Sequence, residues 1–445
     1  MRVLRGMAAA RAILERRSIL DVEIPPAEAA RFQAVFGAAI TAEEFVRRVY
    51  AEVGEDGDAG VRRIAAAVGE PVPERLEVER PEIDAALGRI PPELRADLEM
   101  AAERVRRFHE QTAPKDWTDD AMGVGQLFRP VEQAGVYAPG GRAAYPSSIL
   151  MTAIPAKVAG VGRLVVASPG GPDGSVPDVT LAAAQIAGAD AVYAIGGAQA
   201  IAALALGTES VPNVDVIAGP GNIFVILAMR QAFGTAGVST LPGPTETLLI
   251  ANDGADAAEV AADLLAQAEH DPMAAPLLLT NSERLATAVE AELERQLADL
   301  PRAEIARVAL GNRGGIGVVA DLQEAVELAN EYAPEHLCLL TDDPWALVPK
   351  VNNAGGIFVG AHSPEVLGDY VAGPSHVMPV GGTARFASPV NVTHFQKTVS
   401  LFALSEETAG GLAPVAARLA RYEGLEGHAR AAEIRLPEEE SPSTD

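Results

Sequence analysis

The middle of the chain alternates between short apolar runs and helical runs, and this alternation limits the fold more than any other feature. From Ala134 onward, the runs GRLVVASPGG, DAVYAIGG and VDVIAGPG are apolar, rich in β-branched residues and end in glycine or proline turns. Each is followed by a run with helical spacing, such as PDVTLAAAQIAGA, AQAIAALALG or NIFVILAMRQAFG. Strands that alternate with helices in this way are typical of βαβ units in a parallel sheet. The pattern therefore predicts an α/β fold.

A second series of the same kind follows the first. The strand candidates TETLLIAND and APLLLTNS alternate with the helical runs ADAAEVAADLLAQAEHD and ERLATAVEAELERQLADL. The turn-rich segment STLPGPTE separates the two series near residue 242. We therefore expect two Rossmann-like parallel-sheet domains, one over residues 134–241 and one that includes residues 242–390.

The two ends of the chain lack this alternation of strands and helices. Residues before 134 carry apolar side chains at helical spacing, as in AEEFVRRVYAEV and ELRADLEMAAERVRRFHEQ. We expect residues 1–30 to form an N-terminal helical segment and residues 31–133 to belong with the second sheet domain. Residues 391–445 should form a small C-terminal tail domain. Its last stretch, LPEEESPSTD, is acidic and rich in Pro and Ser, which predicts disorder.

Composition excludes several classes of function. The 445 residues carry a net charge of -26, which argues against binding to nucleic acid or to anionic membranes. Cys338 is the only cysteine, so neither an intrachain disulfide nor a Cys-based zinc site can form. A chain without disulfides fits a reducing compartment, and no apolar run is long enough to predict a transmembrane span. We therefore expect a cytoplasmic protein with a small-molecule substrate.

Polar residues near four of the seven histidines are candidates for chemistry. Gln267 and His270 lie three positions apart, so they share one face at the end of a helix. Histidine at a helix C-terminus is favoured by the helix dipole alone, whereas His is also the commonest metal ligand and Gln an unusual one. The local sequence leaves both interpretations open.

The other three candidate segments also allow both a structural and a functional interpretation when each is considered alone. Glu335 and His336 follow Pro334, where a glutamate can simply cap a helix. Asp369 can be a turn residue, and His376 a surface histidine in a glycine- and proline-rich loop. The segment YEGLEGH holds two further candidates, Glu423 and His428. We expect structural roles for the remaining three histidines: His109, His362 and His394.

Three glycine turns, VYAPGG, IGGAQA and AGPGN, each end a predicted strand and open a helix. Backbone N–H groups at such a turn can bind an anionic group. However, GPGNIF lacks the third glycine of the dinucleotide-binding fingerprint G-x-G-x-x-G. The pattern alone leaves a nucleotide cofactor open.

Taken together, these segments resemble histidinol dehydrogenase. The motifs that carry the resemblance run in the family's order from about Arg106 to Ala431: GVYAPGGRAAYPSSILMTAIPAKVAGV, GGAQAIAALALGTESVP, GPGN, QAEHDP, NEYAPEHL, GDYVAGPSH and EGLEGH. Seven ordered motifs make a chance match very improbable. The resemblance implies a zinc-dependent homodimer that oxidises L-histidinol to L-histidine in two NAD-dependent steps through an aldehyde.

The resemblance also implies roles for residues of the metal and acid–base site. Four positions match the family's zinc ligands, of which the last is contributed by the other subunit: Gln267, His270, Asp369 and His428. Glu335 and His336 match the acid–base pair. His336 would take the hydroxyl proton as hydride leaves for NAD, and Glu335 would activate water on the aldehyde.

Six further positions match binding contacts of the family. The positions that match substrate contacts are Thr245, His376 and Glu423. The positions that match NAD contacts are Tyr137, Gln199 and Asn222.

The chain departs from the family's usual pattern at a few positions. Met229 stands where many members have lysine, Thr245 where the family often has serine, and THFQKTVSLFAL lacks a frequent Lys-Arg pair. These departures leave open a paralogue that oxidises another small alcohol, such as a sulfonated propanediol. Two other classes of function remain as alternatives. One is a zinc hydrolase in which Glu335 activates a metal-bound water, and the other is a non-catalytic binding protein that kept the scaffold.

Overall fold

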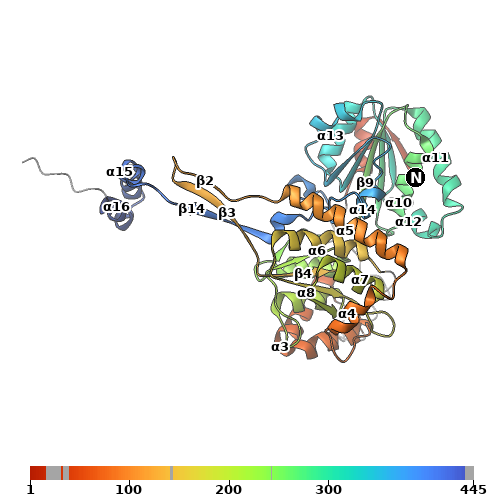
Figure 1. Cartoon of the computed structure of the whole chain (residues 1–445). Coiled ribbons are helices and arrows are strands. Elements are labelled where there is room, and N and C mark those ends of the chain that lie inside the picture. Colours follow the sequence, from red (N-terminus) through yellow and green to blue (C-terminus); the bar gives the residue numbers. More distant parts are fainter. Residues whose placement is uncertain (17–31, 34–39, 141–143, 242, 436–445) are drawn as a thin grey trace, which may run out of the picture. The chain divides into compact units, whose positions relative to one another are not determined.

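The computed structural model describes residues 1–16, 32–33, 40–140, 144–241 and 243–435 (Figure 1). The chain divides into two compact units. The first unit comprises Met1–Ala113 and Val131–Phe395, and the second comprises Pro114–Pro130 and Gln396–Asp445. The first unit holds both parallel sheets, which confirms the predicted α/β class.

The five-stranded sheet of the first unit has the order β6-β5-β4-β7-β8, and all its strands are parallel. Its strands are β4 (Gln133–Tyr137), β5 (Arg163–Ser168), β6 (Ala191–Ala194), β7 (Val216–Ala218) and β8 (Gly237–Val238). The helices that connect them are α6 (Pro146–Ala159), α7 (Asp178–Ala187), α8 (Gly197–Leu206) and α9 (Ile223–Ala232). Helices cover both faces of this sheet, so its central strands are buried throughout and read as continuous apolar runs.

Three earlier helices, α3 (Ala42–Val68), α4 (Arg80–Ala86) and α5 (Pro92–Thr112), also pack on the five-stranded sheet. Phe45 and Val49 of α3 join one apolar cluster with α8 and α9, and Val105 of α5 joins another with β4 and α6. We had expected residues 31–133 to belong with the second sheet. Helical spacing predicts an apolar face but does not say which sheet that face will cover.

The six-stranded sheet has the order β1-β11-β10-β9-β12-β13, and its strands are also parallel. Its strands are β1 (Arg2–Arg5), β9 (Glu246–Ala251), β10 (Ala275–Thr280), β11 (Gly315–Val318), β12 (His336–Leu340) and β13 (Gly356–Val359). Its helices are α10 (Ala257–Ala268), α11 (Glu283–Leu297), α12 (Ala303–Asn312), α13 (Leu322–Tyr332) and α14 (Glu365–Tyr370). Side chains of Asp256, Ser282 and Asp321 cap α10, α11 and α13, which sets where these helices begin.

The N-terminal segment differs from the helical segment that we expected over residues 1–30. Its first residues form β1, an edge strand that pairs with β11, and only then does α1 (Met7–Ile13) follow. Much of the rest of this segment lies outside the described residues. The open edge of β11 supplies the hydrogen-bonding partners that turn a short apolar stretch into a strand.

The two sheets share one connection pattern. In each, the first strand of the series is central, the next two strands add on one side, and the chain then crosses to the other side of the first strand. The crossings place topological switch points between β4 and β7 and between β9 and β12. In open α/β sheets, ligands usually bind outside the carboxyl ends of the strands at such points.

Short 3-10 helices complete the first unit: Pro344–Ala346, Val348–Lys350, Thr383–Arg385 and Val392–Phe395. The second unit is an antiparallel sheet of order β14-β3-β2 with two helices. Its elements are β2 (Trp117–Asp119), β3 (Val124–Pro130), β14 (Gln396–Phe402), α15 (Glu406–Tyr422) and α16 (Glu426–Glu433). The tail domain that we expected from residue 391 therefore also includes residues 114–130.

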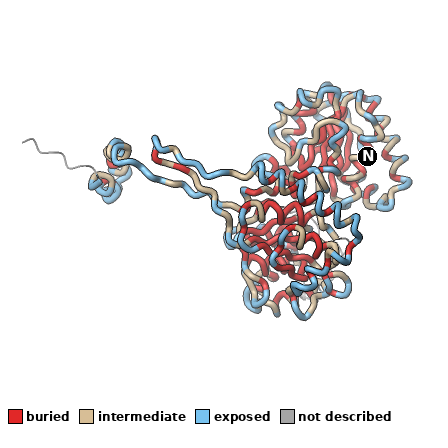
Figure 2. The backbone as a smooth tube through the Cα atoms, in the orientation of Figure 1, coloured by how far each residue is buried: buried red, intermediate tan, exposed pale blue. Residues whose placement is uncertain are grey.

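Helices α15 and α16 bury little of their own surface, and most of their backbone is pale blue in Figure 2. Several large apolar side chains are exposed on them, among them Leu412, Leu419, Tyr422 and Ile434. The stretch LPEEESPSTD, for which we predict disorder, is residues 436–445 and lies outside the described residues. None of the described helices combines the length and apolar character needed to cross a bilayer.

Candidate active site

Five of the residues singled out in the sequence lie at the amino edge of the six-stranded sheet. Thr245 precedes β9, and Glu335 and His336 stand at the start of β12. Strands β9 and β12 are parallel neighbours in which His336 pairs with Thr247, so their first residues meet at one edge. Helix α10 runs back from β9 and brings Gln267, in its last turn, to the same edge. The fifth residue, Asp369, comes from α14, which packs against α10.

Glu335 is a buried carboxyl group held by two donors. Its Oε2 accepts hydrogen bonds from the Thr245 hydroxyl at 2.7 Å and from the Glu246 N–H at 3.0 Å. Burial raises the pKa of Glu335 to about 7, although the positive charge of His336 and the two hydrogen bonds oppose the shift. Glu335 can therefore both hold and release a proton near neutral pH.

His336 is buried beside Glu335. Its Nδ1 lies 3.3 Å from the Glu246 carbonyl oxygen and 3.8 Å from Glu335 Oε2, and its Nε2 lies 3.6 Å from Asp369 Oδ1. Nε2 has no hydrogen-bond partner within the residues that the structure describes. Burial lowers the pKa of His336, but the surrounding carboxylates outweigh it and raise the pKa to about 10. The same interaction holds the pKa of Asp369 below its usual value against the effect of burial.

Gln267 is fully buried, and its amide fits its surroundings in one orientation. The amide nitrogen then donates to Glu365 Oε1 at 3.0 Å, and the amide oxygen lies against the Thr245 hydroxyl and 3.1 Å from the Glu246 nitrogen, whose N–H it shares with Glu335. A neutral side chain at the end of an apolar helix is thus fixed by three polar groups. These contacts explain why a glutamine is buried in the last turn of the otherwise apolar α10.

Glu365 is a site residue that the sequence analysis missed. It is only 1% exposed, and burial raises its pKa to about 8, although His336 opposes the shift. Glu365 stands four positions before Asp369, so the two carboxyl groups share one face of α14. That spacing was the available signal, but Glu365 follows Pro364 at the start of the helix, where a glutamate is common for capping alone.

His270 follows Gln267 after the last turn of α10, and it is exposed as a residue. Burial of its ring nevertheless lowers its pKa, and the charge of Asp369 opposes the shift. The described part of the chain contains no cluster of three or more His, Cys, Asp or Glu side chains arranged to hold a metal. The available donors, Gln267, His270 and Asp369, are nitrogen and oxygen groups of the kind that zinc binds. They fit a zinc site that needs a further ligand.

His376 joins the cluster from the loop after α14. Its Nδ1 lies 2.5 Å from the Asp369 carbonyl oxygen, to which it donates, and its Nε2 lies 3.3 Å from the Ser148 hydroxyl. Burial lowers the pKa of His376, and the Asp369 carboxylate opposes this shift. A neutral ring that donates through Nδ1 leaves Nε2 as an acceptor.

The remaining two metal- and substrate-site candidates lie on the second unit. Glu423 is the C-cap residue of α15, and His428 lies in the first turn of α16; both are exposed. Neither is part of the cluster in the first unit. Their roles stay predictions.

The three predicted cofactor residues gather at the carboxyl edge of the five-stranded sheet. Tyr137 ends β4, Gln199 lies in the first turn of α8 after β6, and Asn222 caps α9 after β7. Tyr137 and Asn222 therefore flank the switch point between β4 and β7, where open α/β sheets bind ligands. The Tyr137 hydroxyl accepts a hydrogen bond from the Gly197 N–H at 3.1 Å. The Asn222 side chain accepts bonds from the N–H groups of Phe224 and Val225.

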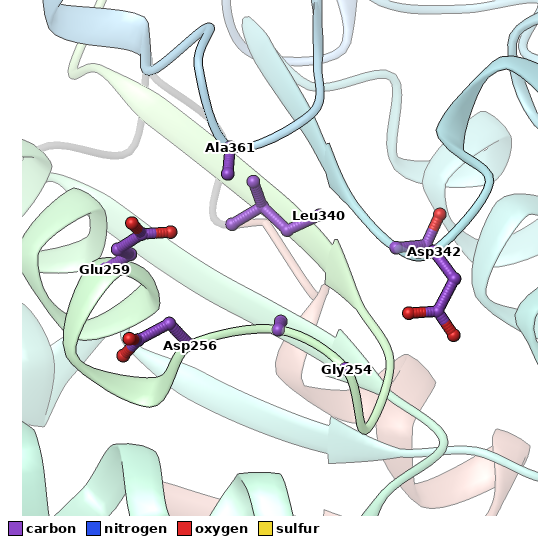
Figure 3. A pocket seen from close by; sticks show the side chains of 8 residues that line it. Gly254, Asp256, Glu259, Leu340, Asp342 and Ala361 are labelled. Carbon is purple, nitrogen blue, oxygen red and sulfur yellow. The ribbon is translucent and has the colours of Figure 1, made fainter.

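The corresponding carboxyl edge of the six-stranded sheet holds a cavity of about 190 Å³ instead. The carboxylates of Asp256, Glu259 and Asp342 line it, together with Gly254 and Leu340 (Figure 3). Three carboxylates disfavour the phosphates of a dinucleotide. The first sheet is therefore the better candidate for the cofactor, and the acid–base residues of the second sheet lie at its opposite edge.

Comparison with known proteins agrees with this architecture. The family model for histidinol dehydrogenase matches residues 37–436. The histidinol dehydrogenase of Deinococcus radiodurans is 50% identical over 440 residues, which cover 98% of this chain and 100% of the relative. The enzyme of the same name from a Synechococcus strain is 51% identical over 368 residues, or 81% of this chain and 84% of the relative. The crystal structure of histidinol dehydrogenase from Elizabethkingia anophelis has a TM-score of 0.89 at 29% identity and covers 98% of each chain.

The two parallel sheets and the relatives together define a dehydrogenase of the α/β class. The chain belongs to the histidinol dehydrogenase family. The relatives do not favour the alternative of a paralogue that oxidises another small alcohol. Met229, one of the departures that raised this alternative, is fully buried in the apolar cluster of α3, α8 and α9, where a methionine packs without cost.

Proposed function

We propose that this chain oxidises L-histidinol to L-histidine through the aldehyde, with two NAD and one zinc ion per active site. The observation that carries the proposal is the pairing of Glu335 with His336 beside Thr245, Gln267 and Asp369. Dehydrogenation of an alcohol needs a base for the hydroxyl proton, and oxidation of the aldehyde needs an activated water. The pair offers one group for each task.

Gln267, His270 and Asp369 would hold zinc, with His428 as the fourth ligand. Zinc there would bind the amino and hydroxyl groups of the substrate and would offset part of the carboxylate charge that raises the pKa of His336. His376, fixed by its bond to the Asp369 carbonyl, would orient the substrate from the same side. Thr245 would contact substrate while it holds Glu335.

His336 would take the hydroxyl proton in the first oxidation, through the Nε2 atom that lacks a partner. NAD, when bound, would supply the acceptor for the hydride of the substrate carbon. Glu335, whose pKa lies at about 7, would next remove a proton from a water that attacks the aldehyde. The hydrated aldehyde would give a second hydride to a second NAD and release its remaining hydroxyl proton to solvent, which leaves the carboxylate. Tyr137, Gln199 and Asn222 would hold NAD at the carboxyl edge of the first sheet.

A homodimer with a shared active site is part of the same proposal. His428 and Glu423 lie on a unit whose helices expose Leu412, Leu419 and Tyr422. Exposed apolar side chains in such number are typical of a surface that pairs with another chain. In the dimer, His428 and Glu423 of one subunit would complete the site of the other. A lone, buried Cys338 supports a location in the cytoplasm.

The stoichiometry of the reaction tests the proposal. Purified protein with zinc and excess NAD should form two NADH for each L-histidinol consumed, and mass spectrometry should identify L-histidine as the product. One NADH per substrate, with aldehyde accumulating, would contradict the four-electron reaction. Consumption of substrate without any NADH would favour a zinc hydrolase instead.

A further inference from the structure

The carboxyl group of Glu70, which belongs to none of the sequence motifs, lies in the proposed cofactor site. Glu70 follows Gly69, the left-handed residue (φ 73°) that ends α3, and its own N–H donates to the Ala65 carbonyl at 2.8 Å. Its side chain reaches the turn between β6 and α8. There, Oε1 accepts a hydrogen bond from the Gly196 N–H at 2.6 Å, and Oε2 accepts one from the Gln199 amide nitrogen at 2.5 Å.

Both hydrogen bonds are short, as expected for bonds to a carboxylate. Burial raises the pKa of Glu70 to about 7, while the two hydrogen bonds lower it. The Tyr137 hydroxyl accepts a hydrogen bond from the neighbouring Gly197 N–H, and burial and the charge of Glu70 both contribute to raising the pKa of Tyr137. Glu70 therefore binds one predicted cofactor residue, Gln199, directly, and it binds the N–H next to the one that Tyr137 binds.

The backbone at this turn leaves little freedom. A Cβ atom at Gly196 would lie 2.6 Å from Pro169 Cβ and 2.9 Å from Glu70 Oε1, so only glycine allows the carboxyl group to approach so closely. Gln199 itself is only 1% exposed. The bond to Glu70 takes one N–H of the Gln199 amide and so fixes which way the amide faces, which leaves its oxygen and its second N–H for a ligand.

We propose that Glu70 is a positioning residue of the dinucleotide site, which fixes the Gln199 amide so that its oxygen accepts a hydrogen bond from a hydroxyl group of the cofactor. This inference rests on the proposed function, because it takes Gln199 to be a contact of NAD. Glu70 acts through Gln199 and does not need to touch the cofactor.

A double-mutant cycle on the zinc-loaded enzyme tests this role. We would measure the Kd for NAD by calorimetry in the wild type, Glu70→Ala, Gln199→Ala and the double variant. Glu70→Ala should raise the Kd by about tenfold, because a bond to a charged group is lost and the amide is free to turn. In the Gln199→Ala background, the same change should have an effect of less than about twofold, since the residue through which Glu70 acts is absent. The KM for NAD should rise with little change in kcat.

Two further variants separate positioning from folding. Glu70→Gln keeps the size of the side chain but has one acceptor oxygen for the two donors, so its amide nitrogen must face either the Gln199 amide or the Gly196 N–H. It should therefore raise the Kd for NAD while the Tm and zinc content stay unchanged. The exposed Glu74, four positions away, provides the matched control Glu74→Gln, which should alter nothing.

An unchanged Kd in Glu70→Gln, or an equal effect of Glu70→Ala with and without Gln199, would overturn the role of Glu70 and leave the proposed function intact. Absence of NAD binding by the wild type would overturn the proposed function and, with it, this role.

Discussion

At the scale of single residues, the candidate active site is a histidine surrounded by buried carboxyl groups. Glu335, Glu365 and Asp369 all lie close enough to His336 to alter its pKa. Buried carboxyl groups are costly unless they are hydrogen-bonded or paired with a charge. Glu335 has Thr245 and a backbone N–H as donors, whereas one oxygen of Glu365 lacks a partner among the described residues. Several buried ionisable groups with shifted pKa values close together are typical of functional sites.

His270→Ala and Asp369→Ala should each lose bound zinc together with activity, because each removes a proposed ligand. Metal analysis after dialysis would measure zinc per subunit. His362→Ala, which removes an exposed histidine outside the cluster, is the control and should retain the metal. Full zinc content in either variant would show that the substituted residue is not a zinc ligand.

His109 should make folding depend on pH. It is fully buried in α5, neither ring nitrogen has a partner within the described chain, and burial lowers its pKa to about 4. Between this pKa and the unfolded value of about 6.5, only the unfolded chain binds the proton. The free energy of unfolding should therefore decrease as the pH falls through this range, with a slope of about one proton from His109.

His109→Leu should remove that part of the slope. Urea titrations of the wild type and the variant at several pH values between about 4 and 7 would measure it. Equal pH slopes in the two proteins would show that His109 is not responsible.

At the scale of elements, the turns at the carboxyl edge of the first sheet are shaped by close backbone contacts. Gly219, between β7 and α9, has φ 141°, and a Cβ atom there would lie 2.0 Å from the Tyr137 carbonyl oxygen. The ends of β4 and β7 can approach each other only because this residue is glycine. The turn then places Asn222 as the cap of α9.

Gly219→Ala should therefore displace the β7–α9 turn and weaken NAD binding by about tenfold or more, with a lower Tm. Gly234→Ala is a matched control, because Gly234 also has a positive φ (105°) but has open space around its Cβ position. Calorimetry with NAD and thermal melting would compare the two. The same loss of affinity in both variants would show that backbone strain, not the contact with Tyr137, is the cause.

At the scale of the whole molecule, two sheets with the same connection pattern carry different chemistry at different edges. The candidate cofactor residues lie at the carboxyl edge of the five-stranded sheet, and the acid–base cluster lies at the amino edge of the six-stranded sheet. The second unit carries His428 and Glu423. If His428 of one subunit completes the site of the other, as proposed, mixed dimers provide a direct test.

His270→Ala and His428→Ala should each be inactive alone but recover activity when their subunits are mixed. A mixed dimer has one site with both histidines and one site with neither, so random exchange should restore about a quarter of the wild-type activity. The assay would follow NADH after co-refolding of equal amounts. Absence of any recovery would contradict a site shared between subunits.

Much of the fold could be predicted from the sequence, because the periods of apolar residues distinguish strands from helices along most of both series. The partners of those elements could not be predicted in the same way. The apolar faces of α3 and α5 gave no indication that they cover the first sheet, and the first residues formed a strand only because β11 had a free edge. The residues of the candidate site also divide into those that the sequence predicted and those that it did not. Gln267, Glu335 and Asp369 stood out in motifs, whereas Glu365 and Glu70 had no local signal that separated them from ordinary charged residues.

The sequence by itself determined the kinds of elements, the two α/β series and the motifs that carry the family resemblance, since these depend on local spacing and residue type. Only the tertiary structure decided which residues meet. The start of β12 reaches Thr245 because β12 pairs with β9 across about 90 residues of chain, and Glu70 reaches Gln199 across a similar or greater separation. Such contacts depend on which strands pair and which faces pack together, and local spacing does not encode that choice.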